Sequence, residues 1–218
     1  MKFSLKTIVL TLAIATLVGA SSMIAGPCPT FESDVVPARL NHTQMGGLWY
    51  EYAFTSDYTE DMGYDCASWN MLAHATNDSF LDTKYEVLHH SMNMTNNKTA
   101  FHRMSMTCGQ QGTPNSQYCS FAKQEAPTIV HKMTTHKPRG MQIISTDMNS
   151  HLVASMCYEY GLFHYIDYLV LTREKQPGMY IRGKVLKALK EKAKFTDEQV
   201  QAMTKGLVYE CWGEDRFL

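Results

Sequence analysis

The chain has 218 residues, and its 20 Lys and Arg against 21 Asp and Glu give a formal net charge of -1. This near-neutral balance argues against a nucleic-acid partner, and the chain has neither a basic tract nor a phosphate-binding Walker loop. The length fits one domain, because no internal repeat, low-complexity stretch or Pro-rich linker divides the chain.

The first twenty residues are typical of a cleaved secretory signal. Lys2 and Lys6 precede an uncharged apolar stretch over 7–18, and small residues end at Ala20. This stretch is too short for a membrane anchor, because spanning a bilayer needs roughly 20 residues. We therefore predict a signal peptide over residues 1–20, a secreted, extracellular protein without stable membrane insertion, and an N-terminal leader over 21–45.

Runs rich in Val and aromatic residues, bounded by turn clusters, follow the leader. The loops between successive runs are short, so neighbouring strands must be antiparallel. Closing such a sheet into a barrel removes the unpaired edge strands that an open sheet would expose to aggregation. The pattern predicts an all-β, antiparallel up-and-down barrel over 46–174, with strands over 47–55, 65–75, 82–91, 98–107, 117–123, 127–135, 140–146, 151–160 and 164–173.

The apolar period changes beyond Arg173. From 177 to 194 apolar residues recur three and four positions apart with lysines between them, which indicates an amphipathic helix on the outside of the barrel. Thr196 and Gln199 form a capping-box pattern that starts a second, shorter helix ending near Gly206. Residues 175–218 are thus predicted to form a helical tail packed on the barrel; the apolar positions of the first helix are Ile181, Val185, Leu186, Leu189 and Ala193.

All six cysteines follow the predicted signal, and an even number in an oxidising compartment favours three disulfides. A metal site is not expected, because the cysteines are dispersed, without a Cys-x-x-Cys pair or histidines at ligand spacing. Acceptors for N-glycosylation fit the same compartment, and they are Asn41, Asn77, Asn93 and Asn97.

Three landmarks resemble the lipocalin family in their order and spacing. The run Gly47-Leu48-Trp49-Tyr50-Glu51 opens the first strand, Thr146-Asp147 separates two later strands, and Arg173 closes the last one. Together with Cys28-Pro29, Cys66 and Cys157, the match is nearest to apolipoprotein D and the insect bilin-binding lipocalins. It covers roughly 28–211, although residues 77–135 match only as a strand pattern.

The resemblance implies an eight-stranded barrel with a C-terminal helix and assigns structural roles. Trp49 would pack across the closed end with Arg173 over its ring, next to Gly47 and the Thr146-Asp147 loop. Met148 stands where the family usually has Tyr. The implied disulfides join Cys28 to Cys157, Cys66 to Cys211 and Cys108 to Cys119.

One of the nine predicted strands is surplus to an eight-stranded barrel. Cys108 and Cys119 flank the turn-rich segment 109–115, so we expect 108–124 to form a stapled hairpin extension and not a barrel strand.

The resemblance also implies the function: binding and carrying a small hydrophobic ligand, such as a lipid, fatty acid, retinoid or pigment, in the barrel cavity. Loops 56–64, 92–97 and 160–163 would lie at the open end, where the acidic run 57–61 would govern access. Strand alternation then suggests the lining residues Trp69, Met71, Tyr85, Val87, Met104, Met106, Ile143, Met156 and Tyr165.

Other functions remain open. The barrel could be the scaffold of a secreted interaction module that meets a cell-surface receptor. A haem-binding variant would use His89 or His102 as axial ligand. An isomerase or de-epoxidase would need a reactive thiol or acid inside, and we expect neither an enzyme nor a cofactor, because hydrolase and metalloprotease motifs are missing and the even cysteine count leaves no spare thiol.

Overall fold

The computed structural model describes residues 24–28, 41–54, 66–74, 83–93, 98–109, 117–121, 140–160 and 162–205. The strands are β1 (Ile24–Ala25), β2 (Gly47–Phe54), β3 (Cys66–His74), β4 (Thr83–Asn93), β5 (Lys98–Cys108), β6 (Tyr118–Phe121), β7 (Gly140–Thr146), β8 (His151–Tyr160) and β9 (Phe163–Thr172). A 3-10 turn, η2 (His42–Met45), precedes β2, and the helices α3 (Met179–Glu191) and α4 (Asp197–Lys205) follow β9.

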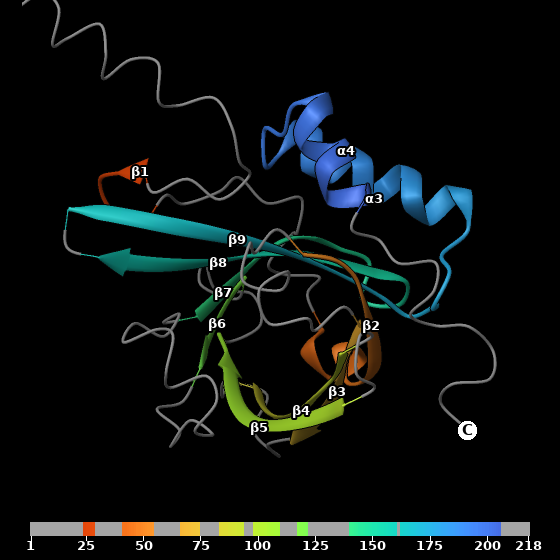
Figure 1. Cartoon of the computed structure of the whole chain (residues 1–218). Coiled ribbons are helices and arrows are strands. Elements are labelled where there is room, and N and C mark those ends of the chain that lie inside the picture. Colours follow the sequence, from red (N-terminus) through yellow and green to blue (C-terminus); the bar gives the residue numbers. More distant parts are fainter. Residues whose placement is uncertain are drawn as a thin grey trace, which may run out of the picture.

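Strands β2 to β9 form a closed antiparallel barrel (Figure 1). Each strand pairs with the next, and β9 pairs both with β8 and with β2, so the sheet meets itself. The predicted fold class, an eight-stranded up-and-down barrel with a C-terminal helix, is confirmed. Consecutive strands alternate in direction, so the β2 start, the β7–β8 turn and the β9 end share one end of the barrel.

The prediction for 108–124 was wrong. Tyr118–Phe121 is the barrel strand β6, which pairs with β5 through 106–108 and with β7 through 140–142. Residues 109–117 therefore connect two neighbouring barrel strands. The turn-rich composition of this segment reflects that connection, and the Cys108–Cys119 disulfide joins directly opposed residues of the two strands. The predicted strand 127–135 lies outside the described residues.

The barrel wall is buried on both sides along β9. Leu169 and Leu171 pack into the barrel, whereas Tyr168 and Val170 pack outwards against the helices. The inner and outer clusters are separate because side chains alternate between the two faces of a strand. A β-bulge at Tyr52 in β2 changes this alternation, so that Trp49 and Phe54 both face inwards.

Helix α3 covers the outside of the barrel and buries Val185, Ala188 and Leu189 against β7 to β9 (Figure 1). It is shorter than the predicted 177–194, because Gly178 is the N-cap and the chain leaves the helix at Lys192, two residues before Lys194 adopts a φ of 61°.

The predicted capping box before α4 is confirmed. The backbone N–H of Gln199 donates to Thr196 Oγ1 at 3.2 Å, and the Thr196 N–H donates to Gln199 Oε1 at 2.9 Å. Gly206, the predicted end of this helix, lies outside the described residues. Neither α3 nor α4 has the length and apolarity required to cross a bilayer.

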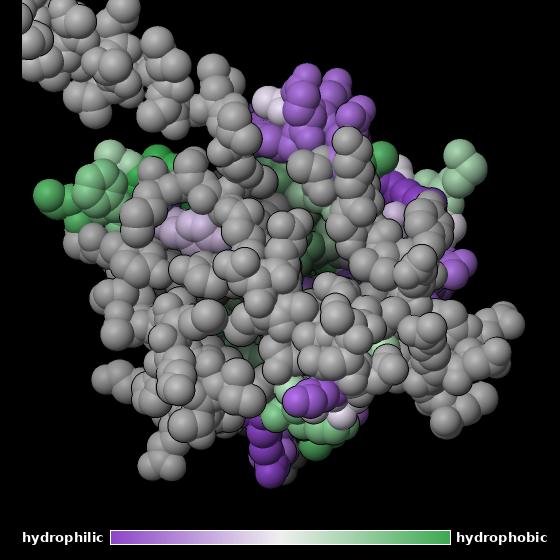
Figure 2. Space-filling view, in the orientation of Figure 1, coloured by the Kyte–Doolittle hydropathy of each residue, from purple (hydrophilic) through white to green (hydrophobic). Residues whose placement is uncertain are grey.

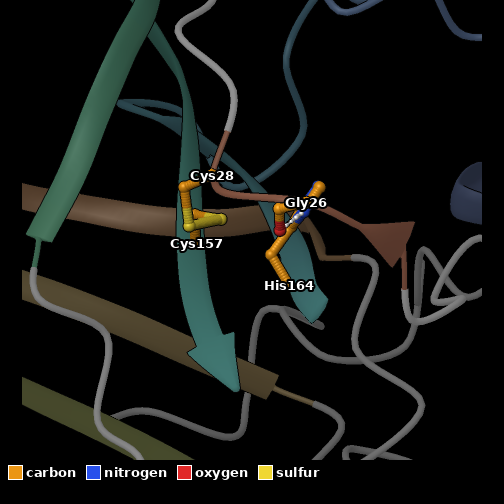
Figure 3. Close-up of a disulfide and its surroundings, with 4 residues drawn as sticks. All are labelled: Gly26, Cys28, Cys157 and His164. Carbon is orange, nitrogen blue, oxygen red and sulfur yellow. Dashed lines mark hydrogen bonds between the residues drawn. A yellow bond between two sulfur atoms is a disulfide. The ribbon is translucent and has the colours of Figure 1, made fainter. Parts of the chain in front are cut away.

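The N-terminal leader is attached to β9 and β8 near their shared turn (Figure 3). Strand β1 pairs with the start of β9, and His164 Nδ1 donates a 2.8 Å hydrogen bond to the Gly26 carbonyl. The predicted Cys28–Cys157 disulfide is present beside this contact. The predicted signal peptide, 1–20, and most of the leader lie outside the described residues.

Candidate functional site

Trp49 and Arg173 meet at the closed end, as predicted. The Arg173 guanidinium carbon lies 3.7 Å from the centre of the Trp49 ring, and the Trp49 side chain is fully buried. Arg173 also donates to the backbone carbonyls of Gln44, Gly46 and Leu48 at 2.6 to 2.9 Å. The guanidinium therefore joins the end of β9 to the turn and strand that begin the barrel.

Gly47 makes room for this contact. Its φ of +96° belongs to the region that favours glycine, and a Cβ there would lie 3.1 Å from Arg173 Nη1. The indole N–H of Trp49 donates to the Met45 carbonyl at 2.7 Å, so η2 is fixed beneath the ring. Together these contacts close one end of the barrel.

The Thr146-Asp147 turn lies at the same end. Asp147 accepts hydrogen bonds from the backbone N–H and hydroxyl of Ser150, and Lys184 of α3 donates to it at 3.0 Å. Burial by itself would raise the pKa of Asp147, but the bonds from Ser150 and Lys184 outweigh it and lower that pKa well below its usual value. The turn therefore holds an ionised carboxylate that ties α3 to the barrel.

Met148, which replaces the family's usual Tyr, takes part in this packing. It adopts a φ of 65°, packs against the inner cluster, and its sulfur accepts the backbone N–H of Asn41. Asn41, a predicted glycosylation acceptor, uses its side-chain oxygen to accept the Thr43 N–H at the start of η2. The side chain of Asn93, and Asn77 and Asn97, lie outside what is described, so glycosylation stays a prediction.

The closed half of the barrel interior is filled with side chains. Five predicted lining residues are at most 1 % exposed there, and burial raises the pKa of the Tyr85 phenol. These five residues are Met71, Tyr85, Val87, Met106 and Ile143. They act as core in this structure, and a ligand could not contact them unless they moved.

Of the remaining predicted lining residues, Trp69, Met156 and Tyr165 lie nearer the open end along their strands, whereas Met104 pairs with Val87. Trp69 and Met156 belong to the inner cluster and are 5 and 6 % exposed, and Met104 borders this cluster and is half-buried. Tyr165 is buried on the inward-facing side of β9, two residues from Asp167 in the direction of the β8–β9 turn. Among the predicted lining residues, Met104 is thus the one that is not buried. The predicted access loop, 57–61, lies outside the described residues.

A polar group interrupts this apolar wall. Trp69 Nε1 donates to Glu51 Oε2 at 3.1 Å, and His89 Nε2 lies 3.9 Å from the same oxygen. The Trp69 and His89 rings meet edge to face, 5.4 Å apart. His89 was predicted only as a candidate haem ligand. Glu51 was not predicted to face the inner wall, although Glu51 shares strand parity with Trp49. Strand register places His102 opposite His89, but the side chain of His102 is not described.

Cysteine pairing agrees with expectation as far as it is described. Cys28–Cys157 and Cys108–Cys119 are formed, and Cys66 is disulfide-bonded too. Its predicted partner, Cys211, lies outside the described residues. Over the described ranges, no three His, Cys, Asp or Glu side chains are grouped closely enough to hold a metal ion.

Comparisons with known proteins place the barrel among solved structures. It is similar to apocrustacyanin C1, with 13 % identity, a TM-score of 0.55 and coverage of 81 % of this chain and 87 % of the other. Lobster apocrustacyanin A1 gives 14 % identity, a TM-score of 0.53 and coverage of 78 % and 83 %. The cockroach allergen Per a 4 gives 13 % identity, a TM-score of 0.50 and coverage of 77 % and 87 %.

No family model and no curated protein matches the sequence of this chain. At these identities the likeness concerns the fold, and the nearer resemblance to apolipoprotein D and the insect bilin-binding proteins stays a prediction. The closed barrel, its C-terminal helix and these structural matches together show that the chain has the lipocalin fold.

Proposed function

We propose that this protein is secreted and carries a small apolar ligand in the open half of its barrel. The observation that carries this proposal is the graded exposure of the inner wall: five lining residues are at most 1 % exposed, whereas Trp69 and Met156 are 5 and 6 % exposed and Met104 is half-buried. The disulfides Cys28–Cys157 and Cys108–Cys119 support an oxidising, extracellular location.

Burial of apolar surface would supply the affinity. At roughly 25 cal/mol per Å², a ligand that buries about 300 Å² gains ~7.5 kcal/mol before the cost of ordering it. The rigid, plugged end of the barrel limits that cost, because the binding wall is largely preformed. Micromolar affinity corresponds to about 8 kcal/mol, so it requires a ligand that buries more than about 330 Å² of apolar surface, with a further margin for the ordering cost.

Displacement of a neutral apolar fluorescent probe tests the proposal. We expect Met104→Arg to weaken probe binding at least about tenfold, because a charge would be buried against the inner wall. Phe101→Arg is the matched control, since Phe101 lies on the same strand but is 62 % exposed on the outer face. Probe binding that is missing in the natural protein, or that is unaffected by Met104→Arg, would contradict ligand carriage.

A second candidate function rests on the outer wall. Leu48, Leu72, Leu88 and Phe101 are 42 to 62 % exposed on the outer face of β2 to β5, and apolar surface is visible over β4 and β5 in Figure 2. Exposed apolar patches of this kind often mark protein interfaces. If Phe101→Arg abolished binding to a cell-surface receptor while probe binding persisted, the scaffold function would operate alongside ligand carriage.

We further propose that the protein is not an enzyme. The inner wall carries the carboxyl groups of Glu51 and Asp167 among its apolar side chains, but each cysteine described is disulfide-bonded. A catalytic thiol of the kind that an isomerising barrel would need is therefore not offered by these cysteines.

A further inference from the structure

The inner wall of the barrel carries two carboxyl groups. By strand register, the ionisable Asp, Glu and Lys side chains at inward-facing positions of the described strands are Glu51, Asp167 and Lys98. Lys98 begins β5 at the open rim and is exposed, and Asp167 is only 3 % exposed. Glu51 is 16 % exposed, so it is the inner carboxylate that a ligand can reach.

Glu51 is held in position by its neighbours. The Trp69 indole donates to Oε2, and the His89 imidazole lies beside that same oxygen, while both rings pack against each other. A carboxylate accepts about four hydrogen bonds, so Glu51 keeps acceptor capacity that the Trp69 indole does not use. The bulge at Tyr52 follows immediately and turns the next side chains of β2.

We propose that Glu51 forms a polar subsite inside the barrel that selects apolar ligands carrying a hydrogen-bond donor, above all a protonated amine. This inference rests on the proposed ligand-carrying function and narrows its ligand class. A protonated amine next to Glu51 gains a charge-assisted hydrogen bond in a partly desolvated site. A fatty-acid carboxylate would instead bring a second negative charge to the same wall. It would therefore be repelled by Glu51, or would bind only in its protonated form.

The subsite lies on the open-end side of the fully buried part of the inner wall. Met71 and Val87 are neighbours of Trp69 and His89 on the side of the closed end, and both are fully buried. An alkyl chain that reached Glu51 with its polar end would therefore leave its tail on the open-end side, where Met156 lies on β8. The geometry favours one polar end and one apolar chain in the ligand.

A matched series of probes tests this selection. Dodecylamine, dodecanol and dodecanoate share one alkyl chain and differ only in the head group, and an alkyl amine is protonated at pH 7. Each compound is titrated against the protein that holds a neutral apolar fluorescent probe. We expect the amine to bind about tenfold more tightly than the carboxylate, with the alcohol between them.

Glu51→Gln should reduce this preference to less than about threefold, because it removes the charge. The Gln carbonyl can still accept the Trp69 indole N–H, so the wall should keep its shape. Glu86→Gln is the matched control: Glu86 is a glutamate of the same sheet that faces outwards and pairs with Arg103 at 2.5 Å. This control should leave the order and the affinities unchanged.

The outcomes separate the subsite from the function on which it rests. Equal binding of the three compounds by the natural protein would overturn the subsite while leaving ligand carriage intact. This measurement does not depend on the folding of any variant. A preference that persists in Glu51→Gln would overturn it too. If none of the compounds displaces the probe and Met104→Arg leaves the affinity for the probe unchanged, the proposed ligand carriage itself is contradicted.

Discussion

At the scale of single residues, Arg173 combines two kinds of contact in one guanidinium. It lies over the Trp49 ring and donates to three backbone carbonyls at the start of the barrel. Lysine could reproduce the charge but not this planar set of donors. The residue therefore acts as a structural clamp at the closed end of the barrel.

We expect Arg173→Ala to lower the free energy of unfolding by about 1 to 3 kcal/mol, because a cation–π contact and several hydrogen bonds are lost. Arg173→Lys should recover only part of this loss. Urea unfolding measures the stability, and a probe titration on the same samples should give nearly unchanged affinity. A normal stability with collapsed probe binding would show that the clamp assignment is wrong.

At the scale of elements, the β7–β8 turn links the barrel to α3 through charge. Asp147 binds Lys184, and the neighbouring His151 is 3 % exposed, with its ring 3.4 Å from the Asp147 carboxylate. Burial lowers the pKa of His151 below 6.5 despite the attraction of Asp147. The unfolded chain therefore binds this proton more readily than the folded protein.

Stability should consequently fall as the pH is lowered. The contribution of neutral His151 is present above pH 6.5 and is lost as the pH falls below that value towards the folded-state pKa. The lowered pKa of Asp147 adds a second loss below its usual value of 3.8. We expect the melting temperature to drop less between pH 7 and pH 5 in His151→Gln than in the natural protein or in the control His74→Gln, which changes an exposed histidine. An equal drop in all three would remove His151 from this role.

At the scale of the whole molecule, disulfides join segments of the chain to one another in addition to the hydrogen bonds between strands. Cys28–Cys157 attaches the leader, and Cys108–Cys119 joins β5 to β6. The predicted third link, Cys66–Cys211, would tie the C-terminal tail to β3. Because it closes a loop of more than a hundred residues, its loss could cost as much as ~5 kcal/mol.

Non-reducing peptide mapping should therefore recover Cys66 joined to Cys211, together with the two described links and no free thiol. Reduction followed by alkylation should release all six cysteines and serves as the control. A peptide that joins Cys66 to another cysteine would overturn the third pairing.

Much of the architecture followed from local patterns. Alternation and turn residues predicted β7 and β8 with their observed bounds, and the Thr196 capping box predicted α4 because these signals depend only on neighbouring residues. The Trp49–Arg173 contact came from a family resemblance, since residues so far apart in sequence leave no local sign of their contact.

Tertiary structure alone decided which residues matter inside the barrel. Alternation places residues on two faces, but it cannot say which face is internal when helices bury the outer one, as they do over β9. The place of β6 depended on hydrogen bonds to strands on both sides, and the Glu51 subsite depended on Trp69 and His89 arriving from other strands. The sequence by itself determined most of the strands, the two helices and the class of fold, because those depend on periodicity. The closed register determined which side chains are core, which remain accessible and which carboxylate faces a ligand, because those depend on contacts between strands.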